Sequence, residues 1–204
     1  MKTNTLLVFM FLLFAISSHA QIVYVMNGNI FLKNNKGTKT QLTFNGNNSN
    51  PVLSPDKTLL AFVHIKSGKS ILTGIGESDP TELWIITLKN KKLEKLLNPF
   101  DSDDMRYVIA NISAVQFSND SKTIFFLSDA WVTSGAVHKI NIKTKVENFV
   151  APGNSLEVIR NGKYKGDIKV NQHRYHEKGG SYNCDYILTP NGKEVAVLKD
   201  SCSE

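Results

Sequence analysis

The chain has 204 residues, of which 41% are hydrophobic and 21% are charged. These fractions are those of an ordinary globular protein and exclude a disordered chain. The formal net charge of +6 comes from 24 Lys and Arg residues against 18 Asp and Glu residues. Because the lysines are scattered through polar turns with acids between them, and no aromatic and basic face is visible, we expect no nucleic-acid partner.

The first twenty residues have the composition of an export signal. Lys2 precedes an apolar segment from Leu6 to Ile16, and small residues provide the −3 and −1 positions of a cleavage site before Gln21. The apolar segment is shorter than the roughly 20 residues that a membrane span needs, and no second one follows. We therefore predict a signal peptide at 1–20 and a domain at 21–204, with no membrane span after cleavage. The expected localisation is periplasmic or secreted, and an uncleaved anchor is the alternative.

After Gln21, short apolar segments alternate with polar turns, a pattern typical of β-strands. Asn27-Gly28 is a two-residue hairpin signal between the expected strands 22–26 and 29–33. Further strand-turn-strand units are expected at 82–97 and 137–150, at a spacing of about fifty residues, which is the size of one four-stranded blade. Shorter strands are expected at 40–43, 59–63, 123–127, 156–160, 166–173, 182–188 and 194–198, and polar loops at 66–80 and 98–105.

Two segments, 51–63 and 115–127, are imperfect copies of one another. The two copies align Leu53 with Phe117, Ser54 with Ser118, Asp56 with Asp120, Leu60 with Ile124 and Phe62 with Phe126. In each copy a polar turn precedes an apolar run of five or six residues. Ser, Pro, Asn and Asp suit a tight turn, and a short bounded apolar run is typical of a buried strand. The repeat therefore predicts an all-β repeat architecture.

The first copy and the residues before it resemble the TolB-like β-propeller repeat. That repeat has an Asn-Ile-aromatic strand, a Gly turn, Gln-Leu-Thr, and a Ser-Pro-Asp-Gly-Lys turn before an apolar strand with Phe. The matching residues here are Asn29-Ile30-Phe31, Lys36-Gly37, Gln41-Leu42-Thr43, Asn50-Pro51, Leu53-Ser54-Pro55-Asp56-Lys57 and Leu60-Ala61-Phe62. The Gly of the turn is absent, the second copy has Asn119 at the Pro position, and a third copy from Leu156 on matches weakly.

The resemblance implies an all-β, β-propeller-like fold with about three and a half to four blades of antiparallel four-stranded sheet. Propellers typically close with four to eight blades, so the chain is short for this fold. A compact four-bladed ring, an assembly of two chains and an open curved stack are the alternatives. We expect the ring, with the N-terminal strands 22–43 completing the last blade.

The densest group of functional side chains is His173-Arg174-Tyr175-His176, followed by Tyr182. On a strand, His173 and Tyr175 would share one face, while Arg174 and His176 would share the other. The two histidines then point apart, so we predict no metal site and no cofactor. These five residues are the candidates for ligand or partner binding, because binding residues collect in blade-connecting loops. Strand-end packing is the structural alternative.

Cys184 and Cys202 are the only two cysteines of the chain. In an exported protein, oxidising conditions allow them to form a disulfide, which would tie the C-terminal tail to a strand. Two unpaired thiols are the alternative. A zinc site is not expected, because the sequence contains no CxxC motif.

No catalytic motif is present: GxSxG is missing, and Gly68-Lys69-Ser70 lacks the first Gly of a P-loop. We therefore predict a non-catalytic, exported propeller module, not an enzyme. The resemblance implies protein-protein or ligand binding at the cell envelope, with another envelope or secreted protein, or a second copy of this chain, as the partner. The alternative is a small carbohydrate-acting or metal-dependent enzyme on a propeller scaffold.

Overall fold

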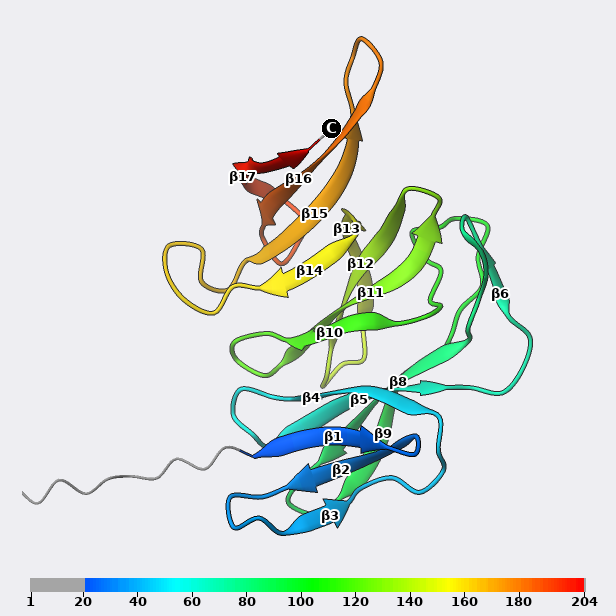
Figure 1. Cartoon of the computed structure of the whole chain (residues 1–204), viewed down its shortest axis with the longest axis vertical. Helices are drawn as coiled ribbons and strands as arrows, with labels where there is room; N and C mark the ends of the chain where they lie inside the picture. The colour runs from blue at the N-terminus through cyan, green and yellow to red at the C-terminus, as the bar shows by residue number, and fades with distance from the viewer. Residues whose placement is uncertain (1–20, 204) are drawn as a thin grey trace, which may run out of the picture.

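The computed structural model describes residues 21–203, which form seventeen strands and no helix (Figure 1). The predicted signal peptide, at 1–20, lies outside the described residues. The strands form four antiparallel sheets that follow one another along the chain, and one separate hairpin. No helix that could cross a membrane is found within residues 21–203.

The four sheets are each built from strands that are close in sequence. The first contains β1 (Ile22–Met26), β2 (Asn29–Lys33) and β3 (Lys39–Gln41). The second contains β4 (Asn48–Leu53), β5 (Leu59–Ile65), β8 (Thr81–Thr87) and β9 (Lys92–Leu97). The third contains β10 (Ser113–Phe117), β11 (Thr123–Trp131), β12 (Ser134–Asn141) and β13 (Glu147–Gly153). The fourth contains β14 (Ser155–Val158), β15 (Ile168–Tyr175), β16 (Ser181–Leu188) and β17 (Glu194–Ser203).

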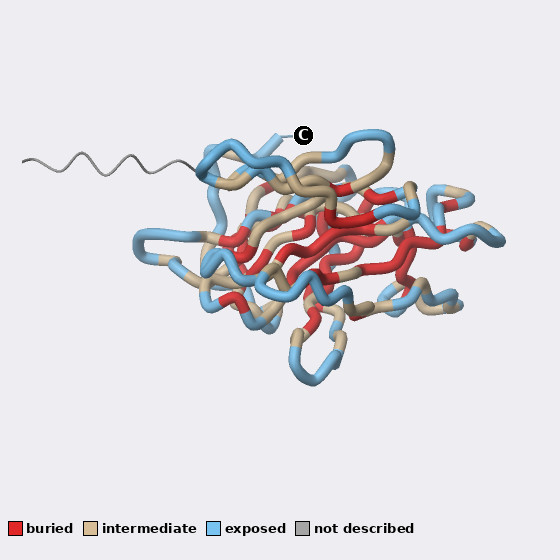
Figure 2. The backbone as a smooth tube through the Cα atoms, turned by 90° about the horizontal axis from the view of Figure 1, so that it is seen from below, coloured by how far each residue is buried: buried red, intermediate tan, exposed pale blue. Residues whose placement is uncertain are grey.

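Three apolar cores join these sheets in chain order. Leu60 and Phe62 on β5 pack toward the first sheet, while Ala61 and Val63 on the same strand pack toward the third. On β11, Ile124 and Phe126 face the second sheet, and Phe125 and Leu127 face the fourth. The apolar runs are continuous because each of these strands is buried on both faces. Figure 2 shows the buried backbone running through the middle of the stack, with exposed turns at its margins.

The predicted repeat is confirmed in detail. Each copy has a β-bulge in its first strand, with Asn50 at φ 50° and Ala114 at φ 47°. In each polar turn the residue directly after the Asp has a positive φ: Lys57 in the first copy and Ser121 in the second. The two copies therefore share backbone geometry as well as side-chain pattern.

The sheets are not closed into a ring, and the place expected for the N-terminal strands was wrong. The N-terminal strands form a sheet of their own beside the second sheet, and the fourth sheet has four strands without them. The first and fourth sheets lie at opposite ends of the molecule (Figure 1). The apolar residues Ile30 and Leu42 of the first sheet pack on Leu60 and Ile86 of the second, and this contact decides where the N-terminal strands lie.

The loop expected at 66–80 contains the hairpin of β6 (Ile71–Thr73) and β7 (Gly76–Ser78). Thr73 Oγ1 and Ser78 Oγ lie 3.2 Å apart, and Ser78 donates to Asp129 Oδ2 at 2.7 Å. Two polar residues of the expected loop, Thr73 and Ser78, are therefore buried, and their hydrogen bonds are satisfied.

Candidate functional site

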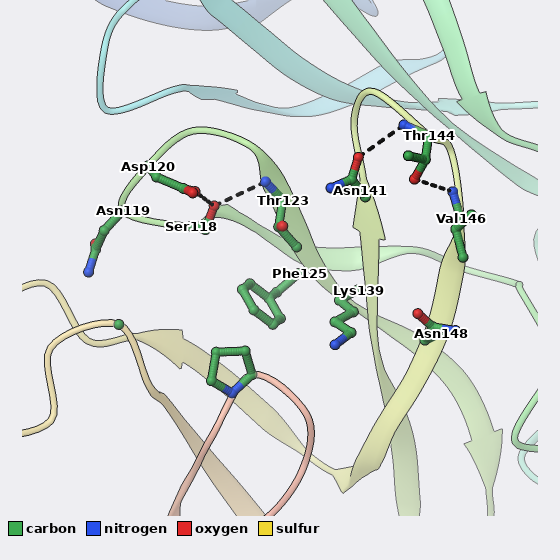
Figure 3. Close-up of a pocket in the computed structure, with 12 residues that line it drawn as sticks. Ser118, Asn119, Asp120, Thr123, Phe125, Lys139, Asn141, Thr144, Val146 and Asn148 are labelled. Carbon is green, nitrogen blue, oxygen red and sulfur yellow. Dashed lines mark hydrogen bonds between the residues drawn. The ribbon is translucent and has the colours of Figure 1, made fainter.

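A cleft of about 640 Å³ opens between the third and fourth sheets (Figure 3). Six of the twelve residues that line it are polar and uncharged, and three of these are asparagines. We call it the asparagine cleft and define it by these residues: Ser118, Asn119, Asp120, Thr123, Phe125, Lys139, Asn141, Thr144, Val146, Asn148, Gly166 and Pro190. Phe125 is 1% exposed and belongs to the core between the two sheets, so the cleft has an apolar floor.

One wall of the cleft is the polar turn of the second repeat. Ser118 Oγ donates to Asp120 Oδ1 at 2.6 Å and accepts from the backbone N–H of Thr123 at 3.0 Å (Figure 3). The backbone N–H of Lys122 also donates to Asp120 Oδ1, at 3.1 Å. These hydrogen bonds, that of Ser118 first, hold the pKa of Asp120 below its usual value. The carboxylate is therefore ionised at neutral pH and is occupied in holding the turn.

The opposite wall comes from β12, β13 and the turn between them. Asn141 Oδ1 accepts from the backbone N–H groups of Lys143 and Thr144, both at 3.0 Å. The ammonium of Lys139 donates to Asn191 Oδ1 in the turn between β16 and β17. This contact joins the third sheet to the fourth across the cleft. On the other wall, Arg160, between β14 and β15, donates to Asn119 Oδ1 at 2.9 Å.

The turn at 189–193 limits the cleft on the side of the fourth sheet. Asn191 and Gly192 lie in the turn of the β16–β17 hairpin, and Gly192 has φ +85°. A Cβ at Gly192 would lie 2.2 Å from the carbonyl oxygen of Val150. Glycine is therefore needed both for the backbone conformation and for the close approach of this turn to β13.

The five residues proposed for binding lie elsewhere, at the end of the hairpin of β15 and β16, which projects from the fourth sheet (Figure 1). His173 Nδ1 lies 3.1 Å from Asn183 Oδ1, and the His173 ring meets the Tyr175 ring edge-on at 5.0 Å. The His176 ring packs on Tyr182 with 4.5 Å between centroids. Tyr182 is the cross-strand partner of Arg174, so His176, which packs on Tyr182, lies on the face of Arg174. His173 precedes Arg174 on the strand and lies on the other face.

Arg174 has structural contacts that its position in the sequence did not reveal. Its Nη2 donates to Gln172 Oε1 at 2.6 Å and to Glu194 Oε2 at 2.9 Å, and its guanidinium lies 3.6 Å from the centroid of the Tyr186 ring. His173 and Arg174 line a smaller hollow of about 340 Å³ that is separate from the asparagine cleft. A binding role for the five residues remains a prediction.

Cys184 and Cys202 form the expected disulfide, which links β16 to β17. Cys184 is 2% exposed, whereas most of β17 is exposed. Among residues 21–203, no group of three or more His, Cys, Asp and Glu side chains is arranged to hold a metal ion.

Two groups of buried, hydrogen-bonded side chains were missed in the sequence. Glu82 accepts from the Lys95 ammonium at 3.0 Å and from the Trp84 indole at 2.8 Å. Burial raises the pKa of Glu82, but these two donors lower it further, so the net pKa lies below its ordinary value. The other group is His138 with Glu147, whose Nδ1 and Oε1 atoms are 2.6 Å apart. Glu82 and Lys95 lie on neighbouring strands, and so do His138 and Glu147. Short sequence motifs do not reveal contacts of this kind.

No protein-family model matches the chain, and no curated protein matches its sequence. Solved structures do resemble it. TolB from Acinetobacter baumannii has a TM-score of 0.56 at 15% identity, over 85% of this chain and 38% of that one. The β-propeller domain of the trilobed protease from Pyrococcus furiosus has a TM-score of 0.56 at 16% identity, over 83% and 48%. Dipeptidyl peptidase 4 from Porphyromonas gingivalis has a TM-score of 0.55 at 13% identity, over 87% and 31%.

These likenesses and the stacked four-stranded sheets define the class: the protein has a β-propeller fold. The neighbours include TolB and the propeller domains of peptidases. The chain spans less than half the length of each of the three, and at these identities the likeness establishes the fold alone.

Proposed function

We propose that this protein is an exported, non-catalytic, TolB-like propeller module that binds an extended segment of another envelope or secreted protein in the asparagine cleft. The proposal of export rests on the composition of residues 1–20 and on the disulfide between Cys184 and Cys202, which suits an oxidising compartment. The proposal of a protein partner rests on the resemblance of the repeat to the TolB-like family.

The observation that carries the binding role is the chemistry of the cleft lining. Amide and hydroxyl groups surround an apolar floor at Phe125, and a pocket with a few convergent polar groups over apolar surface is typical of ligand sites. The amide of Asn148 and the Nδ2 group of Asn141 remain for a ligand, and such groups provide the donors and acceptors that a polypeptide backbone needs. Asn119 is already bound to Ile159 and Arg160, between β14 and β15. Asp120 is the one carboxylate of the lining, and its depressed pKa makes it a poor proton donor at neutral pH.

The alternative is a carbohydrate-acting or metal-dependent enzyme on the same scaffold. An oligogalacturonate lyase in complex with manganese is among the similar structures, with a TM-score of 0.52 at 14% identity. This likeness supports the fold, and the reaction is tested directly by measuring metal content and lyase activity of the purified protein. Bound metal together with turnover of an oligosaccharide would favour the enzyme over the binding module.

The open stack leaves room for a second copy as partner. The outer face of the first sheet carries the stacked rings of Tyr24 and Phe31, 5.5 Å apart, with Ile22 and Met26 about half exposed. Two copies would place eight sheets in one assembly, the upper end of the usual range of propellers. Light scattering of the protein from Gln21 onward tests this arrangement, and a monomer at all concentrations would reject it.

Site-specific crosslinking tests the binding role in the organism that makes the protein. A benzophenone amino acid at Val146, which lines the cleft and is 55% exposed, should give one crosslinked envelope protein. The same probe at Val132, which is 75% exposed and lies outside the cleft, is the matched control. We expect Asn148→Ala to reduce the Val146 product. Equal crosslinked products at both positions, or none at Val146, would contradict partner binding in the asparagine cleft. Retention of the protein in the cytoplasm would contradict export.

A further inference from the structure

A second cleft, of about 620 Å³, lies between the second and third sheets. Its lining is mainly apolar and comes from the end of β9 and from the segment that follows it: Leu96, Leu97, Pro99, Phe100, Tyr107 and Ile109. Phe100 is 56% exposed and Tyr107 is 52% exposed, whereas Leu96 and Ile109 are buried. Two exposed aromatic side chains thus stand at the edge of an apolar hollow.

Glu147, the first residue of β13, is the one charged side chain in this lining, so we call the hollow the Glu147 cleft. Its side chain is only 21% exposed, and Oε1 lies 2.6 Å from Nδ1 of His138. His138 is fully buried between the rings of Phe126 and Phe149, with centroid distances of 5.3 and 5.9 Å. The imidazole therefore fixes the position of the carboxylate at the cleft.

The buried ring also indicates how the proton is placed. His138 Nε2 is buried and has no hydrogen-bond partner among residues 21–203. A doubly protonated ring would place an unmatched N–H donor in this apolar space, which is unfavourable. A neutral ring that donates its single Nδ1–H to Glu147 leaves only an unmatched lone pair at Nε2, and it leaves the negative charge of the carboxylate uncompensated.

The absence of a Lys or Arg partner distinguishes Glu147 from the other glutamates that form ion pairs in the described chain. Glu82, Glu94, Glu157 and Glu194 each lie within 3.0 Å of a Lys or Arg nitrogen. Arg106 lines a hollow next to Glu147, but its guanidinium is held by Asp104 at 2.7–3.1 Å. A partly buried carboxylate without a cation is a costly arrangement that a cationic ligand would relieve.

We propose that the Glu147 cleft binds a lysine or arginine side chain that lies next to an apolar residue in an extended peptide. The cationic group would pair with Glu147, and the aliphatic stem and the neighbouring apolar residue would contact Leu97, Phe100 and Tyr107. The Arg106 guanidinium already lies 5.8 Å from the centroid of the Tyr107 ring, so Phe100 is the aromatic side chain of the lining that a ligand cation would contact. The proposal extends the binding role proposed above to a second site, and separate variants test the two.

The probe is acetyl-Leu-Arg-Leu-amide, titrated into the ¹⁵N-labelled protein from Gln21 onward and followed by NMR. Shifts should map to residues 96–109 and to Glu147, with a dissociation constant on the order of 1 mM. The same peptide with citrulline in place of arginine keeps the shape and removes the charge, and we expect it to bind about tenfold more weakly. Shifts confined to the asparagine cleft would overturn the assignment without affecting the proposed function.

Glu147→Gln removes the charge while keeping an acceptor for His138, and it should weaken the arginine peptide about tenfold and leave the citrulline peptide unchanged. Glu157→Gln, in the exposed ion pair with Lys169 on the fourth sheet, is the matched control and should bind as the unaltered protein does. If Glu147→Gln does not fold, Tyr107→Ser at a half-exposed position should still weaken binding severalfold. Equal binding of both peptides, or no effect of either variant, would refute the proposal.

Discussion

Loss of the disulfide should destabilise the fourth sheet by an amount that can be worked out from the structure. Cys184 and Cys202 are 18 residues apart, and closing a loop of this size lowers the entropy of the unfolded chain enough to contribute about 3 kcal/mol. In a chain of this length, about 1 kcal/mol corresponds to 2–4 °C in melting temperature, so the full effect is about 6–12 °C. We therefore expect reduction to lower the melting temperature by several degrees.

The loss should be concentrated in β17. Val195, Val197 and Leu198 on this strand are 36–46% exposed, so burial contributes little to holding it. Its pairing with β16 is also irregular, with register shifts on both sides of Asp185 to Ile187. Without the disulfide, β17 should open locally at a lower free energy than the core strands.

Thermal unfolding with and without reductant, together with a thiol count, is the assay. The double variant Cys184→Ala/Cys202→Ser should melt with the reduced protein and should not respond to reductant. In the reduced protein and in the double variant, backbone amides of β17 should exchange hydrogen faster than those of β11 or β12. If reduction shifts the melting temperature by less than about 1 °C, or if two free thiols are titrated in the untreated protein, the reasoning is refuted.

Three further predictions concern the turns that border the asparagine cleft. Ser118→Ala removes the hydroxyl that bridges Asp120 and the next strand, and it should lower the free energy of unfolding by about 1 kcal/mol in urea denaturation. The pKa of Asp120 is depressed in the folded state, so the ionised carboxylate stabilises the fold at a pH above the pKa of the unfolded state. This stabilisation is lost as the pH falls through the pKa of the folded state. An NMR titration should show a lowered pKa of Asp120 that rises in Ser118→Ala. Gly192→Ala should lower the free energy of unfolding by at least about 1 kcal/mol, because a Cβ would lie 2.2 Å from the Val150 carbonyl oxygen. Gly162 has a similar φ and open space around it, so Gly162→Ala is the control and should cost less. Equal losses of unfolding free energy in urea would contradict the packing argument.

The sequence alone determined the class of fold and most of its strands. Local rules were sufficient for this, because the turn at Ser118 to Asp120 and the hairpin at Asn27-Gly28 use only neighbouring residues. The short apolar run at 123–127 predicted a buried strand, and the structure buries this strand on both faces. The repeat at 51–63 and 115–127 carries the same information twice, so the architecture could be predicted from a single chain.

Tertiary structure alone decided where the sheets end and which side chains meet. The hairpin at 71–78 was hidden because its buried Ser78 is satisfied by Asp129, about fifty residues away in sequence. The asparagine cleft joins residues from Ser118 to Pro190, and the His138–Glu147 pair depends on neighbouring strands. Such contacts arise from the stacking of whole sheets and leave no periodic signal in the sequence. For the same reason the N-terminal strands were assigned to the wrong end of the stack, since pairing preferences along one strand do not specify which sheet it packs against.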